Sequence, residues 1–123
     1  MKGRPIVFVP SANPRLAARW YVAKLGMRHV GEDAFAAVVR DDAITIRLSL
    51  SENVEPAPYA ILGWEVADIK KAMRQLKAKR VRLLRYPGIG QRADGTWKSP
   101  AGAQVVWFAD RDGNVLSITQ RAR

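Results

Sequence analysis

The chain of 123 residues reads twice in the same order of expected elements, and this internal repeat constrains the fold more than any other feature. In the first half, the apolar residues 5–10 predict a strand, and Asn13 is an expected N-cap for a helix over 15–25. Residues 29–40 predict one or two strands, interrupted near a glycine, and residues 43–50 alternate as a half-buried strand does. This half therefore predicts a strand, a helix and three strands.

The second half repeats this order. Asp68 matches Asn13 at an offset of 55 residues, and the apolar residues that follow it recur at the spacing of one helix face. Expected strands lie at 59–66, 80–86, around Trp97, at 103–109 and at 114–120. Because two halves with one order imply two similar modules, we expect a first module over 1–50, a polar and Pro-rich linker over 51–58, and a second module over 59–123.

Composition excludes several classes of protein. The chain has no cysteine, so it offers no disulfide, no thiolate nucleophile and no cysteine metal site. No apolar run approaches the roughly 18 residues that a membrane span requires, and the Pro-broken start is a poor signal peptide. We therefore expect no membrane partner and a cytoplasmic location.

The net charge of +10 is concentrated in the second half. Residues 68–85 contain eight Lys or Arg and one acidic residue. Such a segment can bind nucleic acid or an acidic surface, but it lacks the interleaved aromatic residues of a single-strand binder and carries no nucleic-acid motif. We favour a solvated helix face followed by a basic strand, and keep nucleic-acid binding as a remote alternative.

The segment "WFADRDGNVLSITQ", residues 107–120, packs three oxygen-bearing side chains into five positions. A calcium loop that starts at Asp110 would need glycine at its sixth position and glutamate at its twelfth, where this chain has Val115 and Arg121. An Asp-Gly pair between two apolar strands is instead a strong hairpin signal. This segment therefore predicts a hairpin turn.

This segment, together with "WYVAKLGM" and "GTWKSPAGAQVVWF", resembles the vicinal oxygen chelate superfamily of glyoxalases, bleomycin-resistance proteins and extradiol dioxygenases. The resemblance covers nearly the whole chain and is strongest at residues 105–120, although Arg111 replaces a usual proline. It implies an α+β fold in which two βαβββ modules form a U-shaped mixed sheet with helices on the outer face. Small members of the superfamily are usually homodimers.

The resemblance also locates four positions at which metal-using members hold a divalent cation. They correspond here to Ile6, Arg47, Ile61 and Ser117. Two aliphatic side chains, one cation and one weak hydroxyl ligand do not suit such an ion. The one histidine, His29, lies elsewhere and is expected on a strand surface. We therefore predict no metal and no other cofactor.

Strand alternation predicts which side chains face the groove. Trp64 falls on the opposite, helix-covered side and is expected in the core, whereas the roles of Trp97 and Trp107 stay open between packing and stacking on a flat ligand. The predicted groove residues are Ile6, Phe8, Thr45, Arg47, Ser49, Ile61, Gly63, Glu65, Trp107, Ser117 and Thr119. Arg47 is the strongest candidate, because a cation in a groove needs a partner such as Glu65 or an anionic ligand.

These residues favour binding over catalysis. We expect a small organic ligand, neutral or anionic, because the positive chain would repel a cation such as bleomycin. A lyase, isomerase or dioxygenase of the same superfamily is the alternative. In a metal-free enzyme, Glu65 as base and Arg47 as electrostatic stabiliser would form the minimal pair; we assign no catalytic residue.

Overall fold

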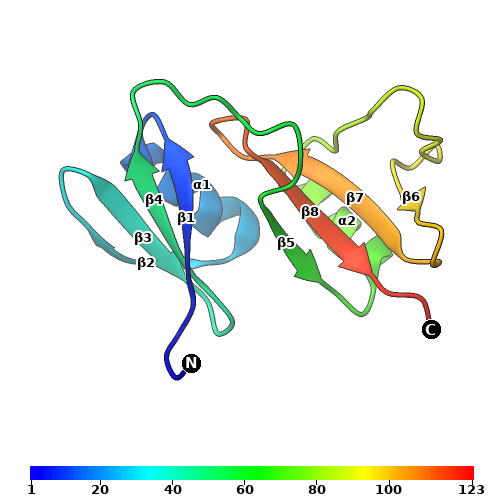
Figure 1. Cartoon of the computed structure of the whole chain (residues 1–123), viewed down its shortest axis with the longest axis horizontal. Helices are drawn as coiled ribbons and strands as arrows, with labels where there is room; N and C mark the ends of the chain where they lie inside the picture. Colours follow the sequence, from blue (N-terminus) through cyan, green and yellow to red (C-terminus); the bar gives the residue numbers. More distant parts are fainter. The chain divides into compact units, whose positions relative to one another are not determined.

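The computed structural model describes all residues from 1 to 123. The chain divides into two compact units. Unit 1 contains residues 1–56 together with the short segment 110–114, and unit 2 contains residues 57–109 and 115–123. Each unit holds one helix and one four-stranded sheet (Figure 1).

Unit 1 contains the first βαβββ module. Its sheet has the order β1-β4-β3-β2, in which β1 and β4 are parallel and the other neighbours are antiparallel. The helix lies against one face of this sheet (Figure 1). Its elements are β1 (Ile6–Ser11), α1 (Pro14–Leu25), β2 (Arg28–Glu32), β3 (Ala36–Arg40) and β4 (Thr45–Leu50).

Local sequence signals set the ends of α1. The Asn13 side chain accepts a hydrogen bond from the backbone N–H of Leu16 at 3.2 Å, and a proline occupies the first helical turn. The helix ends at Gly26, whose φ of 70° is readily adopted only by glycine. Ala17 and Tyr21 on the buried side of α1 pack against the sheet, whose core residues include Val9, Val39, Ile46 and Leu48; all six are fully buried.

Unit 2 contains the second module, whose sheet has the order β5-β8-β7-β6, with β5 parallel to β8 and the other neighbours antiparallel. Asp68 caps α2 by accepting from the backbone N–H of Lys71, and the Gln120 side chain accepts from the backbone N–H of Ile69. Neither helix of the chain has the length and hydropathy needed to cross a membrane. The elements are β5 (Leu62–Glu65), α2 (Ile69–Ala78), β6 (Trp97–Lys98), β7 (Gln104–Ala109) and β8 (Val115–Gln120). The predicted α+β arrangement of two βαβββ modules is confirmed.

The strand predicted at 80–86 is wrong. This segment makes only an isolated bridge between Leu83 and Phe108 and one bond from the N–H of Leu84 to the carbonyl of Trp107. The amide side chain of Gln91 explains the difference, since it donates to the carbonyl of Leu84 and accepts from the N–H of Tyr86. Backbone groups that a neighbouring strand would pair are thus satisfied by one side chain.

The segment 110–114 forms the predicted hairpin turn between β7 and β8, and it is the part of unit 1 that comes from the second half of the chain. The Asp110 carboxylate accepts hydrogen bonds from the backbone N–H groups of Asp112 and Asn114, and from the Asn114 amide. The hydroxyl of Tyr21 donates a fourth bond to it at 2.7 Å. Burial, reinforced by this neighbouring carboxylate, raises the pKa of the Tyr21 hydroxyl far above its ordinary value, so it is a permanent donor.

We predict that Tyr21→Phe destabilises the protein. Tyr21 is fully buried and Asp110 is 6% exposed, so water does not readily replace the lost hydroxyl. A hydrogen bond to a charged group contributes about 1.5–3 kcal/mol, and we expect a loss of that size in the free energy of unfolding. Urea denaturation followed by circular dichroism measures it. Tyr59→Phe is the control, since Tyr59 is 66% exposed, and an equal loss in both variants would contradict the role of Asp110.

Candidate functional site

The candidate site is the face of each sheet that its own helix leaves uncovered. In unit 2, strand register places Gly63, Ser117 and Trp107 in one row across β5, β8 and β7. The next row consists of Glu65, Thr119, Val105 and Trp97. The residues between them in sequence, such as Leu116, Ile118, Val106 and Phe108, are buried on the other face. Trp64 belongs to that buried side, where it stacks on Phe108 at 6.5 Å between ring centroids.

Three aromatic side chains gather on the uncovered face of unit 2. The Trp107 ring lies 5.5 Å from Tyr86 in an edge-to-face arrangement and 5.9 Å from Trp97, with the two indole planes tilted by 40°. All three side chains are half-buried. We call this group the aromatic platform. Such rings combine a large apolar surface with polar N–H or O–H groups, which suits a flat organic molecule.

Gly63 has no side chain, so the row that it shares with Ser117 and Trp107 is shallow at this position. A β-carbon built at this position would lie 2.4 Å from Oγ of Ser117 and 3.2 Å from its carbonyl oxygen. Any larger residue would therefore require Ser117 to shift. The glycine leaves the Ser117 hydroxyl as the polar group next to Trp107 on the sheet surface.

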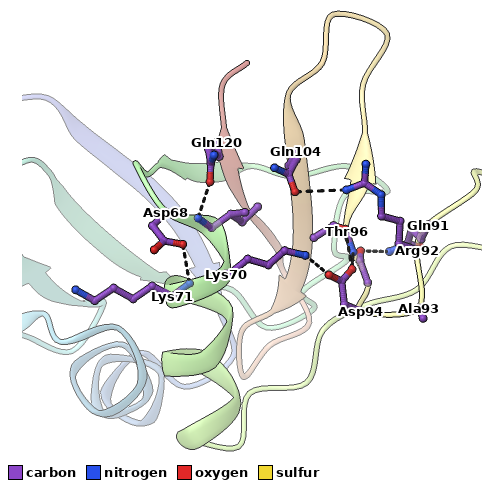
Figure 2. A network of polar contacts seen from close by, with 12 residues as sticks. Asp68, Lys70, Lys71, Gln91, Arg92, Ala93, Asp94, Thr96, Gln104 and Gln120 are labelled. Carbon is purple, nitrogen blue, oxygen red and sulfur yellow. Dashed lines mark hydrogen bonds and ion pairs between the residues drawn. The ribbon is translucent and has the colours of Figure 1, made fainter. Parts of the chain in front are cut away.

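A polar network holds the loop that carries the platform (Figure 2). Asp94 pairs with Lys70 of α2 and accepts bonds from the backbone N–H and the hydroxyl of Thr96, directly before Trp97. Gln91 bridges the backbone of the loop, and the Arg85 guanidinium donates to the carbonyls of Arg92 and Ala93. A bond from the Arg92 guanidinium to the side chain of Gln104 also ties the loop to β7. Together these contacts hold the loop in the arrangement that places Tyr86 and Trp97 next to Trp107.

Glu65 stands at the end of the second row in an ion pair with Arg121, at 2.7 Å between Oε1 and Nε. Both side chains are more than half exposed. A hollow of about 420 Å³ adjoins this pair, and another of about 360 Å³ adjoins Tyr86. Such a solvated, paired carboxylate lacks the desolvated surroundings that tune a general base.

The uncovered face of unit 1 carries the candidate cation. Arg47 lies in register between Phe8 of β1 and Val38 of β3, and its guanidinium forms no hydrogen bond or ion pair within this unit. Its charge helps to lower the pKa of Asp33, although the larger cause is the bonds that this carboxylate accepts from the N–H groups of Phe35 and Ala36.

The other predicted groove residues of unit 1 divide by exposure. Ile6 and Phe8 are 52% and 65% exposed. Ser49 is half-buried, whereas Thr45 is buried and its hydroxyl accepts from Nε of Arg40. Because Thr45 is only 3% exposed, its hydroxyl is not accessible to a ligand.

The four residues that the resemblance places at metal positions do not fit a divalent cation. Ile6 and Arg47 in unit 1 supply an alkyl group and a cation, and Ile61 and Ser117 in unit 2 supply an alkyl group and a hydroxyl whose neighbour is Gly63. No group of three or more His, Cys, Asp or Glu side chains gathers anywhere in the structure. His29 contacts the carbonyl of Gly31 in its own strand.

Comparison with known proteins identifies the family. The protein-family model described as Glyoxalase/Bleomycin resistance protein/Dioxygenase superfamily matches residues 6–118, which is most of the chain. The chain therefore belongs to this superfamily. No curated protein sequence matches it significantly.

Solved structures show the same fold at low sequence identity. A bleomycin resistance determinant encoded on transposon Tn5 is 17% identical with a TM-score of 0.75, over 99% of this chain and 100% of the other. A superfamily member from Sphaerobacter thermophilus is 18% identical with a TM-score of 0.74, over 98% of both chains. An integron cassette protein from the mobile metagenome of Halifax Harbour sewage outfall is 20% identical with a TM-score of 0.71, over 98% and 99%.

Of the platform residues, the sequence predicts only Trp107 in the groove, and its role stays open between packing and stacking. The pattern predicts a strand at Tyr86, and it leaves Trp97 open because a loop of unknown path separates it from β7. Alternation within residues 104–109 does signal that Val105 and Trp107 share a face. The structure brings Gly63, Ser117 and Trp107 together in unit 2, and Phe8 and Arg47 together in unit 1.

We predict that Asp94→Asn destabilises the protein at neutral pH and not in acid. The bonds from Lys70 and Thr96 hold the pKa of Asp94 below its ordinary 3.8, so its stabilisation is complete above that value and declines as the pH falls below it. The melting temperature of the variant should lie below wild type at pH 7, and the gap should narrow below pH 3.8. Asp42→Asn removes an exposed carboxylate as a control. A gap that stays constant with pH would contradict the assignment.

Proposed function

We propose that the chain binds a flat organic molecule, neutral or anionic, on the uncovered face of unit 2 without a metal. The aromatic platform is the observation that carries the proposal. Trp107, Trp97 and Tyr86 present half-buried rings on this face. The missing side chain at Gly63 leaves space next to them, and the Ser117 hydroxyl can orient a bound molecule by a hydrogen bond. An apolar surface with a few fixed polar groups is the usual chemistry of a small-molecule site.

The charge of the protein supports the choice of ligand. A net charge of +10 raises the local concentration of anions and lowers that of cations. On the uncovered face of unit 1, Arg47 has no partner within its unit and can bind a carboxylate or phosphate group. The donor set at the four metal positions supports binding without a cation, and the solvated pair of Glu65 and Arg121 supports binding over acid–base catalysis.

We predict that Trp107→Leu weakens binding to the platform. A library of planar aromatic acids and neutral heterocycles should contain compounds that raise the melting temperature of the wild type by mass action. The same compounds should quench tryptophan fluorescence. Loss of one stacking ring costs about 1–3 kcal/mol for a stacked aromatic group, which corresponds to roughly a tenfold or greater loss of affinity.

Trp20→Leu is the matched control, because it removes the same ring from α1, outside the platform. Arg47→Ala tests separately whether the uncovered face of unit 1 binds anions. Compounds that bind both tryptophan variants as tightly as the wild type would contradict the platform. Stoichiometric zinc, nickel, iron or manganese in protein purified without chelators would contradict metal-free binding.

We also propose that the chain forms a homodimer, with the uncovered face of unit 1 contributing to the contact. Phe8 and Ile6 expose more than half of their side chains there, and a second copy of the chain would cover these apolar groups. Multi-angle light scattering should give twice the chain mass of 13.7 kDa. Phe8→Ser should shift the mass toward one chain, whereas Tyr59→Ser should not. A wild type of single-chain mass would contradict the proposal.

A further inference from the structure

A hollow of about 620 Å³ lies on the α2 side of unit 2. One wall is a face of α2, where Lys70, Met73, Arg74 and Lys77 recur at helical spacing. The segment 80–83, with Ala93 and Asp94 of the loop drawn in Figure 2, forms the rest of the lining. None of these residues belongs to the aromatic platform.

The interior of this hollow is apolar. Met73 and Val81 are 9% and 8% exposed, and Leu83 is half-buried next to Phe108 of β7. The volume falls within the range of sites that hold a small organic molecule. A ligand with an apolar body would therefore replace water over these side chains at a gain in free energy.

The rim of the hollow is strongly positive. Five of its side chains are cations, and Asp94 is its one carboxylate. Asp94 is already bound to Lys70 and Thr96. The remaining four side chains, Arg74, Lys77, Arg80 and Arg82, form neither an ion pair nor a hydrogen bond in the structure. Cations grouped without a counter-charge attract anions and repel one another.

The backbone at Arg80 is a second, independent observation. Its φ of 61° makes it the one non-glycine residue of the chain with positive φ, directly after the C-cap of α2. Its N–H donates to the carbonyl of Lys77, and the N–H of Val81 donates to that of Leu76. Glycine is favoured at such a position because a β-carbon is strained there. The chain therefore places a cation at the rim of the hollow at a position where the backbone conformation favours glycine.

We infer that this hollow binds a small organic anion that has an apolar body and at least two negative charges, with phosphate monoesters as the simplest such chemistry. The apolar interior takes the body, and the four unpaired cations take the charged group through charge-assisted hydrogen bonds. A nucleic acid fits less well. No aromatic side chain lines the hollow on which a base could stack, and the cations converge on one cavity instead of following a strand.

The test uses the full chain and three probes that separate the two parts of the ligand. The probes are 1-naphthyl phosphate, 1-naphthol and inorganic phosphate, each titrated by isothermal calorimetry and by ¹H–¹⁵N NMR. We expect 1-naphthyl phosphate to bind more tightly than either part alone. Its chemical shift changes should centre on α2 and on residues 80–83 and 93–94. Changes confined to the aromatic platform, or equal affinity for inorganic phosphate, would overturn the inference.

Charge reversal on one helix gives a matched pair of variants. Lys77 lines the hollow, whereas the exposed Lys71 of the same helix does not. Lys77→Glu should weaken binding of 1-naphthyl phosphate by about tenfold or more, as expected for a lost hydrogen bond to a charged group. Lys71→Glu should change it little. Equal effects would show diffuse attraction to a positive surface and would overturn the site, as would tighter binding of a DNA oligonucleotide that both variants weaken equally.

Arg80→Gly separates a binding role from a structural one. Glycine relieves the strain at positive φ, so the melting temperature of the free protein should rise or stay unchanged. Binding of 1-naphthyl phosphate should nevertheless weaken, because one rim cation is lost. If the variant melts at or above the wild-type temperature and binds the probe equally well, Arg80 is not part of the site. If its melting temperature falls, the arginine holds the fold and the inference from its backbone is wrong.

Discussion

The structure depends most on the buried carboxylate of Asp110. A charge that loses its water is costly unless hydrogen bonds replace that water, and here four donors do so: two backbone N–H groups, the Asn114 amide and the Tyr21 hydroxyl. The same amide donates to the carbonyl of Pro10, and Asp112 accepts from the N–H of Ala12. One turn therefore anchors the end of β1, the start of α1 and its buried tyrosine, while its shape sets the register of β8 against β7.

That register determines which chemistry each sheet face can present. Side chains along β7 and β8 point alternately to the two faces of the sheet. A shift of β8 by one residue would bury Ser117 and expose Leu116, and a shift of β7 would do the same to Trp107 and Phe108. The turn thus separates the aromatic platform from the core of unit 2. A carboxylate of the turn in this way determines which side chains the uncovered face of unit 2 presents.

Much of the fold follows from the sequence because its signals are local. Caps at Asn13 and Asp68 and strict alternation in residues 45–50 and 115–120 act over a few residues, and they predict the two modules. The Asp-Gly turn is predicted for the same reason. The contact of Tyr21 with Asp110 joins residues 89 positions apart, and nothing in the pattern of either segment indicates it.

The candidate site was less predictable, because long side chains replaced backbone pairing in the loop. Gln91 satisfies groups that would otherwise extend a strand over 80–86, and this places Tyr86 next to Trp107. The basic residues of α2 are exposed, as expected for a solvated helix face, and several of them also line a hollow beside residues 80–83. Only the basic strand expected after the helix is absent.

Unit 1 is built from two segments that are far apart in the sequence, and this affects when it can fold during synthesis. Its last segment, residues 110–114, leaves the ribosome long after Tyr21 and Pro10. Until then, the Tyr21 hydroxyl and the Pro10 carbonyl lack the hydrogen-bond partners that they have in the finished fold. The N-terminal module therefore cannot complete its fold as synthesis proceeds, and a nascent chain that ends anywhere before Asp110 exposes an unfinished core to chaperones and proteases. Contacts between such distant residues also slow folding. We therefore expect the first module to complete its fold only after residues 110–114 have left the ribosome.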